Sequence, residues 1–109
     1  MHVERLQRMV TMLRGLPEEK FDITNWDCGT AACAVGHACL NPIFNEQGLW
    51  LSDGMPAFQG DESWWAVERF FEIDSVQSGH LFYGPDYPNG DLTTAAEVAD
   101  RIEAFIAGG

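Results

Sequence analysis

Residues 30–40 read TAACAVGHACL, and this run decides the fold because it has almost no polar face. Thr30 can cap the N-terminus of a helix here, and the pair Asn41-Pro42 ends it. A helix that is apolar around its whole circumference is buried on all sides. The run therefore predicts a buried central helix at about 30–40, whose small side chains let neighbouring elements approach closely.

Amphipathic patterns on either side of this run predict the helices that cover it. Apolar residues recur at helical spacing over residues 3–16, and Asp61 and Asp74 each stand where they can cap a further helix. Thr94 and Glu97 have the spacing of a capping box, which opens the last helix. We expect a mainly α fold with about five helices packed around the buried central helix.

A small β-ribbon is predicted near residues 49–58. Residues 49–51 suit a short strand, and Asp53-Gly54 is a favoured two-residue turn. Pro56 lacks an N–H group, so the returning strand is expected at an edge. The chain shows no repeat, linker or low-complexity tract, and residues 1–109 are predicted to form a single domain.

The charge balance is strongly acidic, with six basic and seventeen acidic residues and a formal net charge of −11. Direct nucleic-acid binding needs a basic stripe, so we expect none. A protein partner with a basic surface is favoured instead. No apolar run approaches the roughly 20 residues that span a bilayer, so no membrane partner is expected. The N-terminus lacks a signal sequence and the cysteines are odd in number, which favours the cytoplasm of a bacterial or phage-infected cell.

One segment carries residues that could hold a metal. Cys28, Cys33 and His37 offer ligands that zinc accepts in a tetrahedral site, and Cys33 and His37 share one helix face. A fourth ligand would come from elsewhere, and His80 is the first candidate. Cys39 lies far round the same helix and cannot join this group. Zinc is thus the one cofactor that the sequence suggests, although a domain without any cofactor is favoured.

The same segment allows three other interpretations. Cys28 and Cys33 could be a redox pair, since a helix N-terminus stabilises a thiolate. A cysteine could be a nucleophile with His80 as its base and Asp74 or Asp86 orienting that base. The cysteines could instead be small apolar side chains of a buried helix, with His37 donating a hydrogen bond to a backbone carbonyl. The last interpretation is favoured.

An interface is suggested near residues 61–71. The pairs Trp64-Trp65 and Phe70-Phe71 place too many large rings on one helix for a single buried face. Trp65 is therefore the candidate anchor of an interface, with Asp61, Glu62 and Glu68 beside it. The alternative is that Trp65 packs under the loop at 49–58.

The motif C-G-T-x-x-C-x-x-G-H-A at residues 28–38 resembles that of an uncharacterised family of small bacterial and phage proteins. The similarity extends over most of the chain, from residues 21–26 before the motif to residues 98–102 in the last helix. That family has no settled activity, so the resemblance supplies no catalytic residues. Many of its members carry Trp at the position of His37, which disfavours zinc and leaves Cys28 and Cys33 in the shared element.

These observations favour a non-enzymatic acidic protein-binding module. If a phage or mobile element encodes it, the expected role is inhibition of host defence, by occupying a basic nucleic-acid-binding surface as anti-CRISPR proteins do. No phosphate-binding loop, carboxylate pair or serine elbow appears in the sequence. The alternatives are a small zinc-binding or thiol-dependent protein centred on Cys28, Cys33 and His37, and a structural domain.

Overall fold

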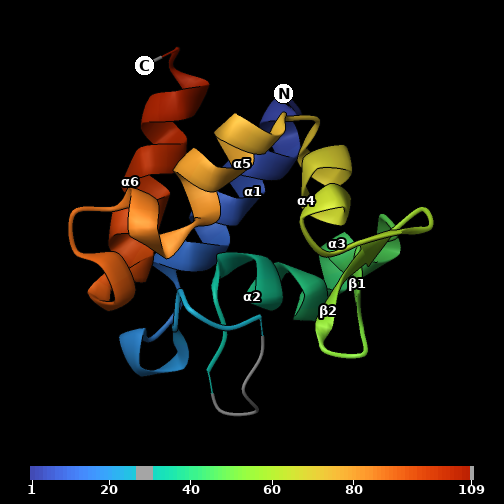
Figure 1. Ribbon diagram of the computed structural model, residues 1–109, viewed down its shortest axis with the longest axis horizontal. Coiled ribbons are helices and arrows are strands. Elements are labelled where there is room, and N and C mark those ends of the chain that lie inside the picture. The colour runs from blue at the N-terminus through green and yellow to red at the C-terminus, as the bar shows by residue number, and fades with distance from the viewer. Residues whose placement is uncertain (27–30, 109) are drawn as a thin grey trace.

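The computed structural model describes residues 1–26 and 31–108. Its fold is built around a short buried helix, α2 (Ala34–Leu40) (Figure 1). The other helices are α1 (Val3–Arg14), α3 (Pro42–Glu46), α4 (Ser63–Phe71), α5 (Ser75–Phe82) and α6 (Ala95–Ile106). The described residues also form the 3-10 turns η1 (Glu18–Lys20), η2 (Gly84–Asp86) and η3 (Gly90–Leu92). The strands are β1 (Trp50–Ser52), β2 (Met55–Phe58) and β3 (Asp61–Glu62). The predicted class, mainly α with a small ribbon, is confirmed.

Helix α2 is buried as expected, but it begins later than the sequence predicted. Residues 31–33 are not helical, and the proposed cap Thr30 lies outside the described residues. Ala32 instead forms a parallel bridge with Phe21, so its backbone groups are satisfied by a neighbouring segment and not by a helix. Cys33 becomes the N-cap, and its Sγ accepts the N–H of Gly36 at 3.4 Å.

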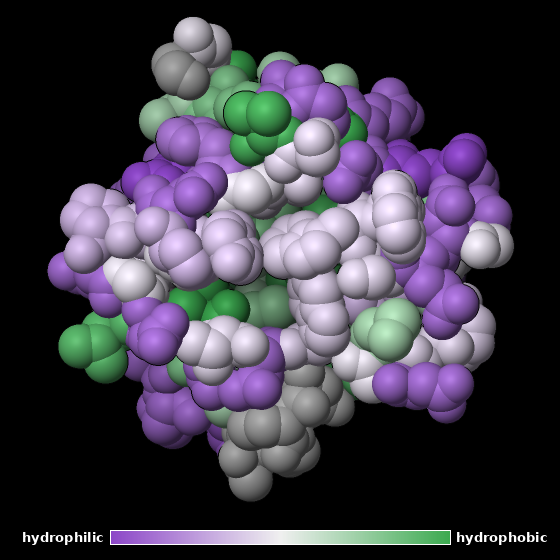
Figure 2. All heavy atoms as spheres, viewed as in Figure 1, coloured by the Kyte–Doolittle hydropathy of each residue, from purple (hydrophilic) through white to green (hydrophobic). Residues whose placement is uncertain are grey.

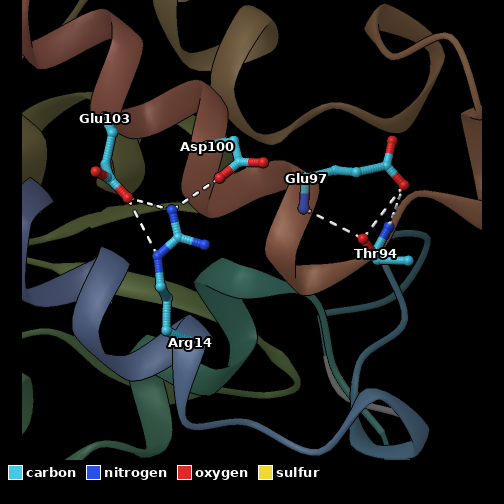
Figure 3. A network of polar contacts seen from close by, with 5 residues as sticks. All are labelled: Arg14, Thr94, Glu97, Asp100 and Glu103. Carbon is cyan, nitrogen blue, oxygen red and sulfur yellow. Dashed lines mark hydrogen bonds and ion pairs between the residues drawn. The ribbon is translucent and has the colours of Figure 1, made fainter.

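Helices α1 and α6 pack against each other more extensively than any other pair of elements. Arg14, near the end of α1, reaches across to Asp100 and Glu103 on α6 (Figure 3). The capping box that opens α6 is confirmed, since the Thr94 hydroxyl accepts the Glu97 N–H at 3.2 Å. Packing of this kind uses the apolar face of each helix, and the sequence of that helix alone specifies the face. The two helices therefore need no special backbone contact with each other.

Phenylalanine rings fill the centre of the core. Phe70 contacts Phe44, Phe58 and Phe71 edge-on, with ring centroids 5.0–5.4 Å apart. Edge-to-face pairs of this kind stabilise a core beyond their buried area. Arg5 covers this cluster, because its guanidinium lies 4.0 Å from the Phe70 ring centroid and donates to the Phe70 carbonyl.

The ribbon confirms the predicted turn and corrects the predicted edge. Asp53 and Gly54 both have positive φ, as a two-residue hairpin turn requires. Pro56 nevertheless lies on the central strand, since the order is β1-β2-β3. Pro56 pairs with Leu51 of β1, whereas β3 pairs only with Ala57 and Phe58. Pro56 therefore has a strand neighbour on one side alone, and its missing N–H does not interrupt the pairing with β3.

The start of α4 also differs from prediction. Asp61 belongs to β3 and does not cap the helix, which begins after Glu62. The side chain of Asp61 pairs with Arg69 instead. Asp74, by contrast, caps α5 as predicted, in a capping box with Gln77. Over the described residues, none of the helices is long and apolar enough to cross a membrane.

Candidate functional site

Residues 20–26, here called the strap, cross the N-terminal end of α2 and hold it through backbone contacts. The Lys20 carbonyl accepts the Ala32 N–H at 3.0 Å, and the Asn25 carbonyl accepts the Cys33 N–H at 2.7 Å. Gly36 makes the close approach possible, because a Cβ at this position would lie 1.5 Å from the carbonyl oxygen of Trp26. Only glycine fits there, so the strap and α2 form one unit.

A cavity of about 430 Å³ opens between the strap, the start of α2, the start of α4 and the end of α5. Its buried residues are Ile23, Cys33, Phe82 and Gly84. Trp26, Trp64 and Tyr83 form its more exposed wall. A hollow surrounded by side chains of intermediate hydropathy is visible near the centre of the face in Figure 2. Its volume lies within the range of about 300–1,000 Å³ that is typical of small-ligand sites.

The aromatic wall is continuous. The Trp26 and Trp64 ring centroids lie 4.9 Å apart with a 60° angle between the planes, and the Trp64 and Tyr83 rings meet edge-on at 6.2 Å. These rings come from the strap, α4 and the residue after α5, so the three elements meet at one place. Tyr83 stays 50% exposed, which leaves part of the wall open to a ligand.

Acidic and neutral groups supply the polarity of the cavity. Asp91 is its one charged side chain among the described lining residues. Thr24 and Asn25 add polar atoms, and both donate to the Asp22 carboxylate, at 2.6 and 2.9 Å. The hydrogen bonds from Thr24, followed by that from Asn25, lower the pKa of Asp22, so this carboxylate remains charged near neutral pH. The local potential therefore favours a cation over an anion.

The two cysteines within the described residues are not activated. Burial raises the pKa of Cys33 to about 11 and that of Cys39 to about 12. The backbone N–H groups at the start of α2 lower the pKa of Cys33, but burial outweighs them. Both thiols are therefore protonated at neutral pH, and a protonated thiol is a poor nucleophile.

The candidate zinc ligands that the structure describes, Cys33, His37 and His80, do not form a group of three that could hold a metal. Cys28 lies outside the described residues. His37 is half-buried and places Nε2 2.6 Å from the Lys20 carbonyl oxygen, the type of bond expected of a structural histidine. His80 is exposed and lines a different hollow, beside Arg101. Among residues 1–26 and 31–108, no three His, Cys, Asp or Glu side chains are grouped so that they could hold a metal.

The four candidate interface residues differ in their exposure to solvent. Trp65 is 71% exposed, so the alternative in which it packs under the loop at 49–58 is wrong. Glu62 is exposed as well, whereas Glu68 is half-buried and Asp61 is already paired with Arg69. The Trp64-Trp65 pair in the sequence indicates an exposed ring at Trp65, but it gives no sign of the cavity that Trp64 lines. Helical position could have shown that the two rings face different ways.

Most of the arginines are paired with groups of the protein itself, some of them at the surface. Four of the five arginines bind the protein's own groups; they are Arg5, Arg14, Arg69 and Arg101. The guanidinium of Arg101 lies 3.8 Å from the Tyr87 ring centroid and donates to the carbonyls of His80 and Asp86. Most of the seventeen acidic side chains therefore have no arginine partner, because the chain has only six basic residues.

Comparison of the chain with protein-family models, with curated proteins and with solved structures found no match in any of the three. The resemblance to small bacterial and phage proteins therefore stays a prediction.

Proposed function

We propose that this protein is a non-enzymatic binding module that engages the basic surface of another protein. The observation that carries the proposal is the charge balance: four of the arginines already bind the protein's own groups, while the net charge is −11. An acidic surface with few free cations attracts a basic partner from a distance and raises the rate of association.

The exposed ring of Trp65 supports the same proposal. Tryptophan is prominent among the residues that dominate the energy of interfaces, and this ring is 71% exposed beside the exposed Glu62. The buried, protonated Cys33 and Cys39 give no support to thiol catalysis.

For a gene carried by a phage or mobile element, the proposed role is inhibition of host defence. The acidic surface would take the place of a nucleic-acid backbone in the basic groove of a defence protein, as anti-CRISPR proteins do. The acidic charge and the small size of the chain support this role.

The test begins with a photo-reactive phenylalanine analogue at position 65, introduced into the protein inside bacterial cells. The same analogue at position 50 is the control, because Trp50 is also exposed, at 54%, and lies on strand β1. A protein captured at position 65 and not at position 50 is then purified, and its affinity is measured over a range of salt concentrations.

The proposal expects affinity to fall as salt rises, because the attraction between exposed charges is screened. Trp65→Ala should weaken binding by about 30-fold, the effect of a typical interface hot spot of about 2 kcal/mol. Glu62→Gln should weaken it less and mainly slow association. Binding that neither salt nor Trp65→Ala changes would contradict the proposal.

A further inference from the structure

The aromatic cavity suits a cationic group that has a flat, apolar body. Its wall consists of the rings of Trp26, Trp64 and Tyr83, and Asp91 supplies negative charge at its rim. Aromatic faces attract cations, and they do so most strongly where water is partly excluded. No Lys, Arg or His side chain is among the described residues that line the cavity, so a phosphate or carboxylate would find no counter-charge there.

The hydrogen-bonding groups of the cavity are suited to a donor-rich ligand. The Nδ2 of Asn25 already donates to Asp22 and to Thr24, and its amide oxygen, which accepts no hydrogen bond from the described residues, is an acceptor. The carboxylate of Asp91 is a second acceptor at the same cavity. A guanidinium presents five N–H donors in one plane, whereas an ammonium is a more strongly hydrated point charge.

The fold twice binds its own arginines in this manner. Arg5 lies over Phe70 and donates to a backbone carbonyl, and Arg101 lies over Tyr87 and donates to two carbonyls. Both sites combine an aromatic face with oxygen acceptors. The cavity offers the same combination, but none of the chain's own arginines is among its described lining residues.

We propose that the cavity between the strap, α4 and α5 receives an arginine side chain of the partner protein. The inference rests on the proposed function, since it identifies where a residue of the basic partner binds. The cavity volume of about 430 Å³ accommodates the side chain with its aliphatic stem along the apolar wall.

The first experiment needs no partner. N-acetyl-arginine amide is titrated into the full chain while the indole N–H signals of the four tryptophans are followed by NMR. The matching derivatives of citrulline, which has the same shape without the charge, and of lysine are the ligand controls. Arginine should shift the signals of Trp26 and Trp64, which line the cavity, and leave those of Trp50 and Trp65 in place. Its affinity should exceed that for citrulline about tenfold.

Variants of two exposed lining residues give the second measurement. Tyr83→Leu and Asp91→Asn should each weaken arginine binding about five- to tenfold, because one removes an aromatic face and the other a charge. Trp50→Leu and Asp53→Asn are the matched controls, since both positions are exposed and neither lines the cavity. Circular dichroism establishes that each variant is folded before its binding is compared.

Three results would overturn the inference: equal binding of arginine and citrulline, shifts confined to Trp50 and Trp65, or unchanged binding by both cavity variants. Adenosine is included as an aromatic ligand without charge, and stronger binding of adenosine than of arginine would also overturn it. The proposed function is tested separately, by the experiment with the partner. If only the proposed function fails, the arginine derivative still binds the cavity, but no partner is found whose binding depends on Trp65. If only the inference fails, the partner still depends on Trp65 while the free arginine derivative does not bind.

Discussion

The pair α1–α6 and the unit formed by the strap and α2 are both built on helices, but different interactions hold them. Helices α1 and α6 meet through amphipathic faces, and side chains such as Arg14 and Glu103 join them at the surface. The strap instead holds α2 by backbone contacts, and the carbonyl of Trp26 lies against Gly36. Side chains can adjust to a substitution, whereas a backbone contact at van der Waals distance cannot. We therefore expect the two regions to differ sharply in their tolerance of change.

The largest effect is expected from Gly36→Ala. The new Cβ would lie 1.5 Å from the Trp26 carbonyl oxygen, so the strap must move away from α2. The free energy of unfolding should fall by about 3 kcal/mol or more, the upper part of the range for overpacking. Urea denaturation measures the change.

Gly15→Ala is the control for that variant. Gly15 follows α1, has a negative φ of −93°, and a Cβ there would find its nearest neighbour at an ordinary 3.8 Å. We expect a change in unfolding free energy of less than about 1 kcal/mol. Equal losses for the two glycines would remove the distinction between the regions.

The next effect concerns Cys33 and separates a structural role from a metal site. Because Cys33 is the N-cap of α2, and serine is a preferred N-cap residue, Cys33→Ser should retain the fold with a small loss. Cys33→Ala should cost about 1 kcal/mol more, because the Gly36 N–H loses its acceptor.

Native mass spectrometry of protein purified without chelator completes this comparison. The structural role predicts that wild type and Cys33→Ser both appear at the bare mass of the chain. A wild-type mass increased by one zinc, lost in both Cys33 variants, would favour the zinc-binding alternative and start a search for the remaining ligands.

A smaller effect is expected at the capping box of α6. Thr94→Ala removes the hydroxyl that accepts the Glu97 N–H, and it should cost about 1 kcal/mol of stability. The hydrogen bond from Asn89, followed by those from Thr94, lowers the pKa of Glu97 below its ordinary value of 4.5. A lowered pKa in the folded state contributes stability that is present above pH 4.5 and is lost as the pH falls through the folded-state pKa.

Urea titrations between neutral and acidic pH measure this contribution. Glu97→Gln should make the stability less dependent on pH below 4.5 than in wild type, and Glu46→Gln, at an exposed position in α3, is the matched control. Identical pH dependence in wild type and Glu97→Gln would contradict the capping role of the charge.

The smallest effect is expected from the ion pairs of Arg14. Asp100→Asn removes one of its two carboxylate partners on α6, and Glu103 remains. Exposed pairs of this kind contribute little, since water and salt screen them. The urea midpoint should shift by no more than the error of its measurement, at low and at high salt alike. A loss as large as that of Cys33→Ala would show that the α1–α6 contact depends on its surface charges.

Prediction from the sequence succeeded where the signal was local. The capping box of α6, at Thr94–Glu97, and the cap of α5, at Asp74, were both predicted, because helix capping depends on residues within one turn. It failed at Asp61, because pairing with β2 and with Arg69 competes with capping. The candidate site was seen in part: Cys33 was singled out, whereas the aromatic wall joins residues far apart in the chain, Trp26, Trp64 and Tyr83.

By itself, the sequence determined the helical class, the burial of α2, the Asp53-Gly54 turn and the acidic charge. Periodicity and capping depend on residues a few positions apart, and composition is a sum over the whole chain. All three can therefore be read from the sequence without knowledge of the tertiary contacts. Only the tertiary structure decided where α2 begins, that the strap passes over Gly36, and that the arginines bind within the protein. Those outcomes depend on which distant backbone and ring groups come together, and packing between elements determines that.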